Sequence, residues 1–150
     1  MSDDTREYFE SVAHKWDEMR RLFFGEGVRN AAIASANITS SSIVADVGTG
    51  TGFIAEGALA AGARVIGIDS SSRMLAEARK RFAEKRFEAR AGDIESLPLS
   101  TAEVDVVLAN MVLHHAPDPS RHSRDEPSAQ TGWKACHHRR RHPHLRVATN

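Results

Sequence analysis

The sequence predicts an α/β domain built on a parallel β-sheet, and three observations carry this prediction. Short apolar segments rich in β-branched residues alternate with helical patterns between residues 43 and 111. These segments are nearly continuous in apolar residues, as is typical of strands buried on both faces. A run of three alternating glycines joins the first strand pattern to a helical pattern. We therefore expect helices on both faces of the sheet and a ligand site at the carboxyl ends of its strands.

The elements are expected in the order helix, helix, strand, helix, strand, helix, strand, loop, strand. A first amphipathic helix over 4–24 carries an apolar stripe of Tyr8, Val12, Trp16 and Met19. The third strand is followed by a loop marked by proline and serine, so the sheet has about four predicted strands. The other helices are expected over about 28–36, 53–62 and 72–85, and the strands over 43–47, 64–68, 87–91 and 104–111.

Charge divides the 150 residues into two parts. Residues 1–119 contain 13 Lys and Arg against 18 Asp and Glu, and residues 120–150 contain 7 against 2, so a net of −5 and a net of +5 sum to zero. This shift predicts a domain over 1–119 and a basic, histidine-rich tail over 120–150. The neutral total argues against a polybasic nucleic-acid-binding protein.

Other features of the composition exclude further classes of protein. One cysteine excludes a disulfide framework, and no apolar run is long enough for a transmembrane helix. The acidic N-terminus lacks the apolar core of a signal peptide, which predicts a cytoplasmic protein. We therefore expect no nucleic-acid and no membrane partner.

Polar residues follow the predicted strands, where a parallel sheet binds its ligands. The turn Gly48–Gly52 lets a ligand approach the backbone, and its G-x-G-x-G spacing differs from the G-x-G-x-x-G of dinucleotide sites. Asp69 ends the second strand, where a carboxylate either accepts hydrogen bonds from vicinal ribose hydroxyls or caps the next helix. Asp93 is placed either to accept from the amine of a purine or to form a turn.

Four of these segments resemble the successive motifs of class I S-adenosylmethionine-dependent methyltransferases, a family with a Rossmann-like fold. The segments are VADVGTGTG (44–52), GIDSSSRML (67–75), AGDIESLPL (91–99) and VDVVLANMVLHHAPDP (104–119). YFESVAHKWDEM (8–19) resembles the cofactor-covering helix of the small-molecule branch, which includes quinone-biosynthesis and arsenite methyltransferases.

The resemblance implies methyl transfer from S-adenosyl-L-methionine to a small-molecule acceptor, with the protein supplying proximity, orientation and exclusion of water. His114 and His115 are candidates for a general base or for a wall of the site. Tyr8 and Trp16 either close over the cofactor or pack as core. No metal is implied. The residues implied to bind the cofactor are Tyr8, Trp16, Asp46, Gly48, Thr49, Gly50, Gly52, Asp69, Ser70, Met74, Asp93, Ile94, Asn110 and Met111.

Two other classes of function stay open from the residues themselves. A nicotinamide-dependent oxidoreductase shares the strand, glycine loop, strand and acid arrangement. Its glycine spacing differs, and the sequence lacks a Tyr-x-x-x-Lys pair. A non-catalytic cofactor-binding remnant is the other alternative.

The resemblance ends at Pro119, after which the family continues with a helix, a Lys-Pro-Gly-Gly turn and a fifth strand. The tail shows no apolar strand pattern. Codons for Gln130–His138, read one base later, permit Lys-Pro-Gly-Gly followed by Lys or Arg, Leu, Val, Ile and Thr. We therefore predict that the chain from about residue 120 is a frameshifted, disordered translation of a truncated domain. The fourth strand then becomes an exposed edge that favours dimerisation or aggregation.

Two further interpretations of the tail stay open. Cys136 with His137, His138, His142 and His144 offers transition-metal ligands, although their spacing matches no defined site. The three arginines that follow His138 offer contacts to phosphate. In either case, loss of the second half of the domain removes much of the acceptor pocket, so we expect a cofactor half-site whose activity as a truncated chain is open.

Overall fold

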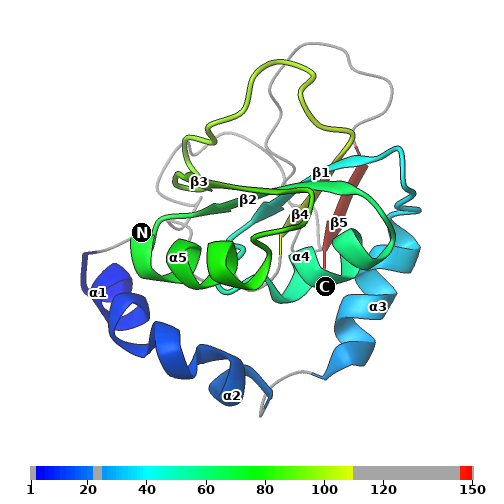
Figure 1. The fold of residues 1–150 in the computed structure, drawn as a ribbon. Helices are drawn as coiled ribbons and strands as arrows, with labels where there is room; N and C mark the ends of the chain where they lie inside the picture. Colours follow the sequence, from blue (N-terminus) through cyan, green and yellow to red (C-terminus); the bar gives the residue numbers. More distant parts are fainter. Residues whose placement is uncertain (1–2, 22–24, 110–145, 150) are drawn as a thin grey trace, which may run out of the picture.

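The computed structural model describes residues 3–21, 25–109 and 146–149, which form a five-stranded parallel β-sheet with helices against it (Figure 1). The Rossmann-like α/β class and the four predicted strands are confirmed. The helical elements are α1 (Asp3–Val12), η1 (Ala13–Lys15, a 3-10 turn), α2 (Trp16–Arg21), α3 (Glu26–Ser35), α4 (Phe53–Ala60) and α5 (Ser72–Arg81). The strands are β1 (Ile43–Val47), β2 (Arg64–Asp69), β3 (Phe87–Ala91), β4 (Val106–Ala109) and β5 (Arg146–Thr149).

The strand order, β3-β2-β1-β4-β5, places β1 in the middle of the sheet. The chain first runs outward through β2 to β3 and then returns to β4 on the other side of β1. At the carboxyl end of β1, Val47 pairs with Ile68 of β2 and with Ala109 of β4. This reversal of direction is the place where open α/β sheets bind ligands, and the glycine turn begins there.

One face of the sheet is covered by α4 and α5 (Figure 1). Their burial follows from apolar side chains at helical spacing, which is the pattern that predicted these helices. Side chains from both layers form one buried cluster, which includes Val44, Val65 and Leu108 of the strands and Ile54, Ala58, Ala78 and Phe82 from the helical layer.

The other face of the sheet is covered by the loop between β3 and β4. Ala45, Val47, Ile66 and Ile68 of the strands pack there against Ile94, Leu97, Leu99 and Val104 of the loop. Pro98 lacks the N–H that a helix needs, and the leucines on either side of it recur at a spacing of two. Within the described ranges, the expected helices on both faces are therefore present on one face only.

The N-terminal helix predicted over 4–24 is broken into α1, η1 and α2. Val12 has φ of −102° and ψ of 0°, and the 3-10 turn begins directly after it. The predicted stripe is buried only in part, because Tyr8 is 50% exposed and the other three residues are half-buried, whereas Ala13 and Arg20 are buried. The break lets the segment follow two different neighbours, α5 and the glycine turn.

The end of the chain differs from the prediction. Arg146–Thr149 forms β5, which pairs in parallel with β4, so the expectation of a tail without a strand is wrong for these four residues. The unpaired backbone groups of β4 offer pairing to any segment with β-forming residues, and β5 contains Val and Thr. The prediction that β4 is an exposed edge is wrong for the same reason, whereas dimerisation through a sheet edge stays a prediction. The candidate metal ligands and the three arginines of the tail lie outside the described residues, and the frameshift from about residue 120 stays a prediction.

Candidate cofactor-binding site

The glycine turn after β1 is held in a left-handed backbone conformation at three positions. Gly48, Gly50 and Gly52 have φ values of +71°, +53° and +92°, which residues with a Cβ atom rarely adopt. The N–H groups of Gly48 and Thr49 donate to the carbonyl oxygen of Ile68, at 2.8 and 3.0 Å. The turn is therefore fixed against the end of β2.

Two of these glycines also lie against aromatic side chains. A Cβ atom at Gly52 would lie 2.2 Å from Cε2 of Phe82, a buried residue that follows α5. A Cβ atom at Gly50 would lie 3.4 Å from Nε1 of Trp16, at the start of α2. The architectural need for glycine is thus strongest at Gly52, whereas Gly50 is covered by the N-terminal segment.

Asp46, the fourth residue of β1, connects the strand to the turn and to α4. Its Oδ2 accepts from the hydroxyl of Thr49 at 2.8 Å and from the N–H of Ala55 at 3.0 Å. The side chain is 1% exposed, and burial raises the pKa of Asp46 to about 7 although both hydrogen bonds lower it. Asp46 therefore holds the turn through Thr49 and the first turn of α4 through Ala55.

Asp69 lies at the carboxyl end of β2 and joins the turn to the start of α5. Oδ2 accepts from the N–H of Gly50 at 2.8 Å, and Oδ1 accepts from the N–H of Ser71 at 2.9 Å. Burial raises the pKa of Asp69, and the hydrogen bonds from the backbone of Ser71, Gly50 and Ser70 oppose this rise. An ionised carboxylate offers about four lone-pair sites, so Asp69 keeps acceptor capacity for a ligand hydroxyl.

The cap of α5 is Ser71, not Asp69. Ser71 is fully buried, and its hydroxyl oxygen accepts from the N–H of Met74 at 3.2 Å. This leaves Asp69 to bridge the turn and the helix start. Met74, predicted to contact the cofactor, is buried on α5 next to this cap.

The aromatic residues predicted to cover the site are placed differently from one another. The ring of Trp16 is half-buried, lies beside Gly50 and packs edge-on against Phe9, with centroids 5.1 Å apart. Tyr8 also packs edge-on against Phe9, with centroids 5.5 Å apart, and is half-exposed. Trp16 thus reaches the turn, whereas Tyr8 lies further along the row.

The remaining predicted residues lie after β3 or beyond β4. The backbone of Asp93 bridges to Ser96, and its Oδ1 accepts from the N–H of Glu95 at 3.3 Å, which is the turn alternative. Ile94 packs on the loop-covered face of the sheet. The predicted Asn110, Met111, His114 and His115 lie outside the described residues.

Two acidic residues near the site escaped the sequence analysis. Glu10 of α1 accepts from the hydroxyls of Ser71 and Ser72, and Asp17 of α2 accepts from the hydroxyl of Thr51. Their partners lie 61, 62 and 34 residues further along the chain. A periodicity of three or four residues carries no signal for contacts at such separations.

The parallel sheet and a glycine turn joined to an acid at the next strand define a Rossmann-like cofactor-binding domain. The profile of a family described as "Methyltransferase domain" matches residues 45–125, which is more than half of the chain. The chain belongs to this family of S-adenosylmethionine-dependent methyltransferases, and its family cofactor is S-adenosyl-L-methionine.

Curated relatives and solved structures agree with this membership. The chain is 33% identical to demethylmenaquinone methyltransferase of Thermobifida fusca over 79% of this chain and 52% of that protein. It is 33% identical to arsenite methyltransferase of Halobacterium salinarum over 59% of this chain and 24% of that protein. A structure of the Haloferax volcanii Trm112 activator with its methyltransferase matches with a TM-score of 0.65 and 25% identity, over 74% of this chain and 50% of that one. The chain spans about half the length, or less, of the curated relatives it matches.

The described ranges contain no helix that is long and apolar enough to cross a membrane. In the same ranges, no group of three or more His, Cys, Asp or Glu side chains is arranged to hold a metal ion.

Proposed function

We propose that this chain binds S-adenosyl-L-methionine at the glycine turn and Asp69, and that it serves methyl transfer to a small-molecule acceptor. One observation carries the proposal: the carboxylate of Asp69 lies between the N–H groups of Gly50 and Ser71, beside the point where the strand order reverses. This arrangement fixes a hydrogen-bond acceptor beside a turn whose glycines let a ligand approach the backbone.

The chemistry of these donors and acceptors fits the cofactor. Asp69 would hold the ribose hydroxyls, because this half-buried carboxylate keeps acceptor capacity beside the backbone N–H groups that fix it. Gly48 and Gly50 would let the methionine part approach the backbone, with Asp46 supporting the turn. Trp16 would cover this part from the N-terminal side.

The bound cofactor supplies a methyl group that is already activated by its sulfonium. This chain's residues would therefore orient the cofactor and exclude water rather than activate the methyl group. Names of relatives, such as arsenite and demethylmenaquinone methyltransferase, support a small-molecule acceptor. His114 and His115 remain proposed bases for an acceptor that must lose a proton.

Isothermal titration with S-adenosylhomocysteine tests the proposal on the full chain. We expect binding by the parent and about tenfold weaker binding by Asp69→Asn, because removal of a charged acceptor from a hydrogen bond lowers affinity by roughly 1.5 kcal/mol or more. Glu77→Gln is the matched control, since Glu77 pairs with Lys80 on the exposed side of α5. NAD⁺ is titrated in parallel, and binding of NAD⁺ without binding of S-adenosylhomocysteine would support the oxidoreductase alternative.

The pH dependence of the affinity provides a second readout. Binding of the ribose hydroxyls favours the ionised form of Asp69, whose pKa is raised by burial. The affinity should therefore decrease as the pH falls through this pKa, and the decrease should be absent in Asp69→Asn. Equal pH profiles for both proteins would remove Asp69 from the proposed site.

A further inference from the structure

Asp17 connects the N-terminal helices to the glycine turn and to α5 at the same time. Its Oδ1 accepts from the hydroxyl of Thr51 at 2.7 Å, and its Oδ2 lies 3.1 Å from Nη1 of Arg81. Thr51 is buried inside the turn, between two of the left-handed glycines. A displacement of α2 would therefore break a charge-assisted hydrogen bond to the turn itself.

The ion pair of Asp17 continues into the helical layer. Nη2 of Arg81 donates to Glu56 of α4 at 2.8 Å, and the other oxygen of Glu56 accepts from Nη1 of Arg29 on α3. Next to Asp17 in space, the guanidinium of Arg20 stacks over the ring of Phe53 at 3.6 Å, with the side chain of Arg20 only 8% exposed. The end of α2 is thus held by both charge and stacking.

Glu10 forms a second anchor, about two turns earlier, at the start of α5. Its Oε1 accepts from the hydroxyl of Ser71 at 2.9 Å and from that of Ser72 at 3.3 Å. Arg73 donates from Nη1 to the backbone carbonyl of Glu10 at 3.2 Å. Ser71 also donates its N–H to Asp69, so a single residue, Ser71, connects Glu10 to Asp69 through hydrogen bonds.

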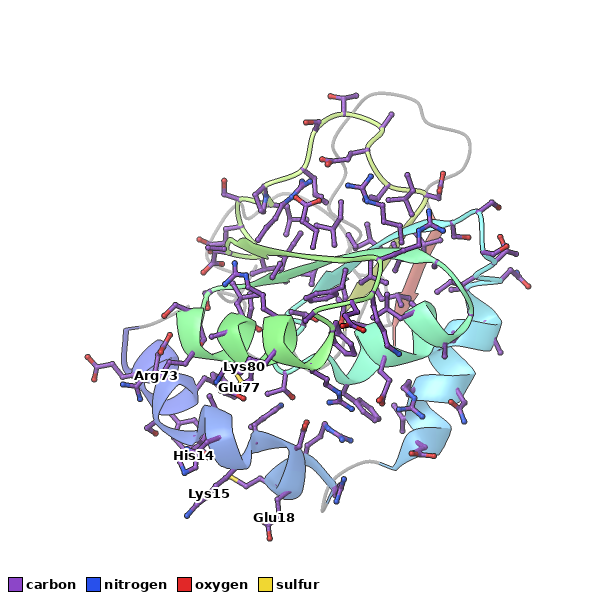
Figure 2. The ribbon with its side chains drawn as sticks, in the orientation of Figure 1. His14, Lys15, Glu18, Arg73, Glu77 and Lys80 are labelled. Carbon is purple, nitrogen blue, oxygen red and sulfur yellow. The ribbon has the colours of Figure 1, made fainter. Side chains whose placement is uncertain are left out.

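The two anchors lie on the inner side of the N-terminal helices. Figure 2 shows Arg73 on α5 directed toward α1, whereas His14, Lys15 and Glu18 lie on the outer side of the N-terminal segment. On the inner side, the carboxylates of Glu10 and Asp17 accept hydrogen bonds from hydroxyl and guanidinium groups. Trp16 lies between these two residues in the sequence and beside Gly50 in space.

We propose that Glu10 and Asp17 are positioning residues, which hold α1 and α2 across the glycine turn and thereby slow release of the cofactor. The inference rests on the proposed function, and it adds two residues that act through Ser71 and Thr51. Each anchor joins the segment to an element that also contacts Asp69 or forms the turn, so an open segment requires both anchors to break.

Surface plasmon resonance on the immobilised full chain, with S-adenosylhomocysteine as the probe, measures this release. We expect Asp17→Asn and Glu10→Gln each to raise the dissociation rate about tenfold, as loss of a charged hydrogen bond predicts. The matched controls are Glu18→Gln and Glu7→Gln, two exposed acids on the same helices. Equal dissociation rates for the anchor variants and the parent would overturn the inference.

Two further readouts separate positioning from a merely structural role. The Asp17 side chain is 42% exposed, so 0.5 M NaCl should raise the dissociation rate of the parent and change that of Asp17→Asn less. Thr51→Val should have a smaller effect in Asp17→Asn than in the parent, because both changes weaken one shared hydrogen bond. Additive effects and equal salt dependence would contradict the role of this contact.

Trypsin digestion without cofactor keeps the test independent of the proposed function. Cleavage after Lys15 and Arg21 should be faster in the Glu10→Gln/Asp17→Asn double variant than in the parent, with the double variant's far-UV circular dichroism checked for folding. If the parent fails to bind S-adenosylhomocysteine, the proposed function fails, and the digestion alone decides whether the anchors hold the segment. If the parent binds and digestion is equal in both proteins, the anchors are overturned while the proposed function stands.

Discussion

The two faces of the sheet are covered by different means. On the helical face, α4 and α5 bury a cluster of apolar side chains, and their first residues adjoin the glycine turn and Asp69. On the opposite face, the described cover is the loop between β3 and β4, which Arg90 ties down by donating to the carbonyl of Pro98 at 2.9 Å and to Glu103 at 2.6 Å.

This difference separates the glycine turn, which depends on close packing, from the loop, which also depends on an exposed ion pair. The turn has no free volume beneath it, because Phe82 fills the space that a side chain at position 52 would need. Beside its apolar contacts with the sheet, the loop is held by the partly exposed ion pair of Arg90 with Glu103, and such pairs contribute little to stability and are screened by salt. Substitutions on the helical face should therefore have larger effects than those on the loop face.

Gly52→Ala should have the largest effect. It places a Cβ atom against Phe82 at a residue with φ of +92°, so we expect a loss of roughly 3 kcal/mol in the free energy of unfolding. Gly27→Ala on α3 is the control, because its Cβ would meet nothing within 4 Å and alanine favours the helix. Urea unfolding followed by circular dichroism measures both, and equal values would contradict the tight packing of the turn.

Asp46→Asn should change the pH dependence of stability on the helical face. Because the folded protein raises the pKa of Asp46 to about 7, the parent loses stability as the pH rises from about 4 to about 7, by at most about 1.4 kcal/mol per pH unit. Urea unfolding between pH 5 and pH 8 should show this contribution in the parent and not in the variant. Thr49→Val removes a hydrogen bond that lowers the pKa, so it should extend the fall to higher pH.

Arg90→Met should have the smallest effect on global unfolding. It releases Pro98 and Glu103, so chymotrypsin should cleave after Leu99 faster while the urea midpoint changes less than in Gly52→Ala. Salt should speed the same cleavage in the parent. A fall in stability as large as that of Gly52→Ala would mean that the loop contributes to the core as much as the helices do.

Local pattern was sufficient to predict the strands and the ligand-binding edge. β1 and β3 begin and end at the predicted residues. β1 is a mostly apolar run with four buried residues, as in a strand covered on both faces, whereas β3 alternates apolar and charged residues and is half-buried. Asp69 was predicted beside the turn from the rule that strand ends meet at one edge, and it accepts from Gly50 there.

Contacts between distant segments decided the rest. The break after Val12 and the roles of Glu10 and Asp17 depend on partners on α5 and in the turn, which no local spacing encodes. The pairing of β5 with β4 likewise depends on an open strand edge rather than on the composition of the tail. At Asp93 the turn alternative is present through the bridge to Ser96, and the contact with a purine stays a prediction.

The three left-handed glycines also shape the unfolded chain. Glycine has more backbone freedom than any other residue, so ordering Gly48, Gly50 and Gly52 costs about 0.5–1 kcal/mol more for each than ordering alanine in a regular element. Within five residues, the turn therefore concentrates an unusually large loss of conformational entropy. A ligand that binds only the ordered turn shifts this local equilibrium toward order, which makes hydrogen exchange at Gly48–Gly52 a sensitive reporter of binding.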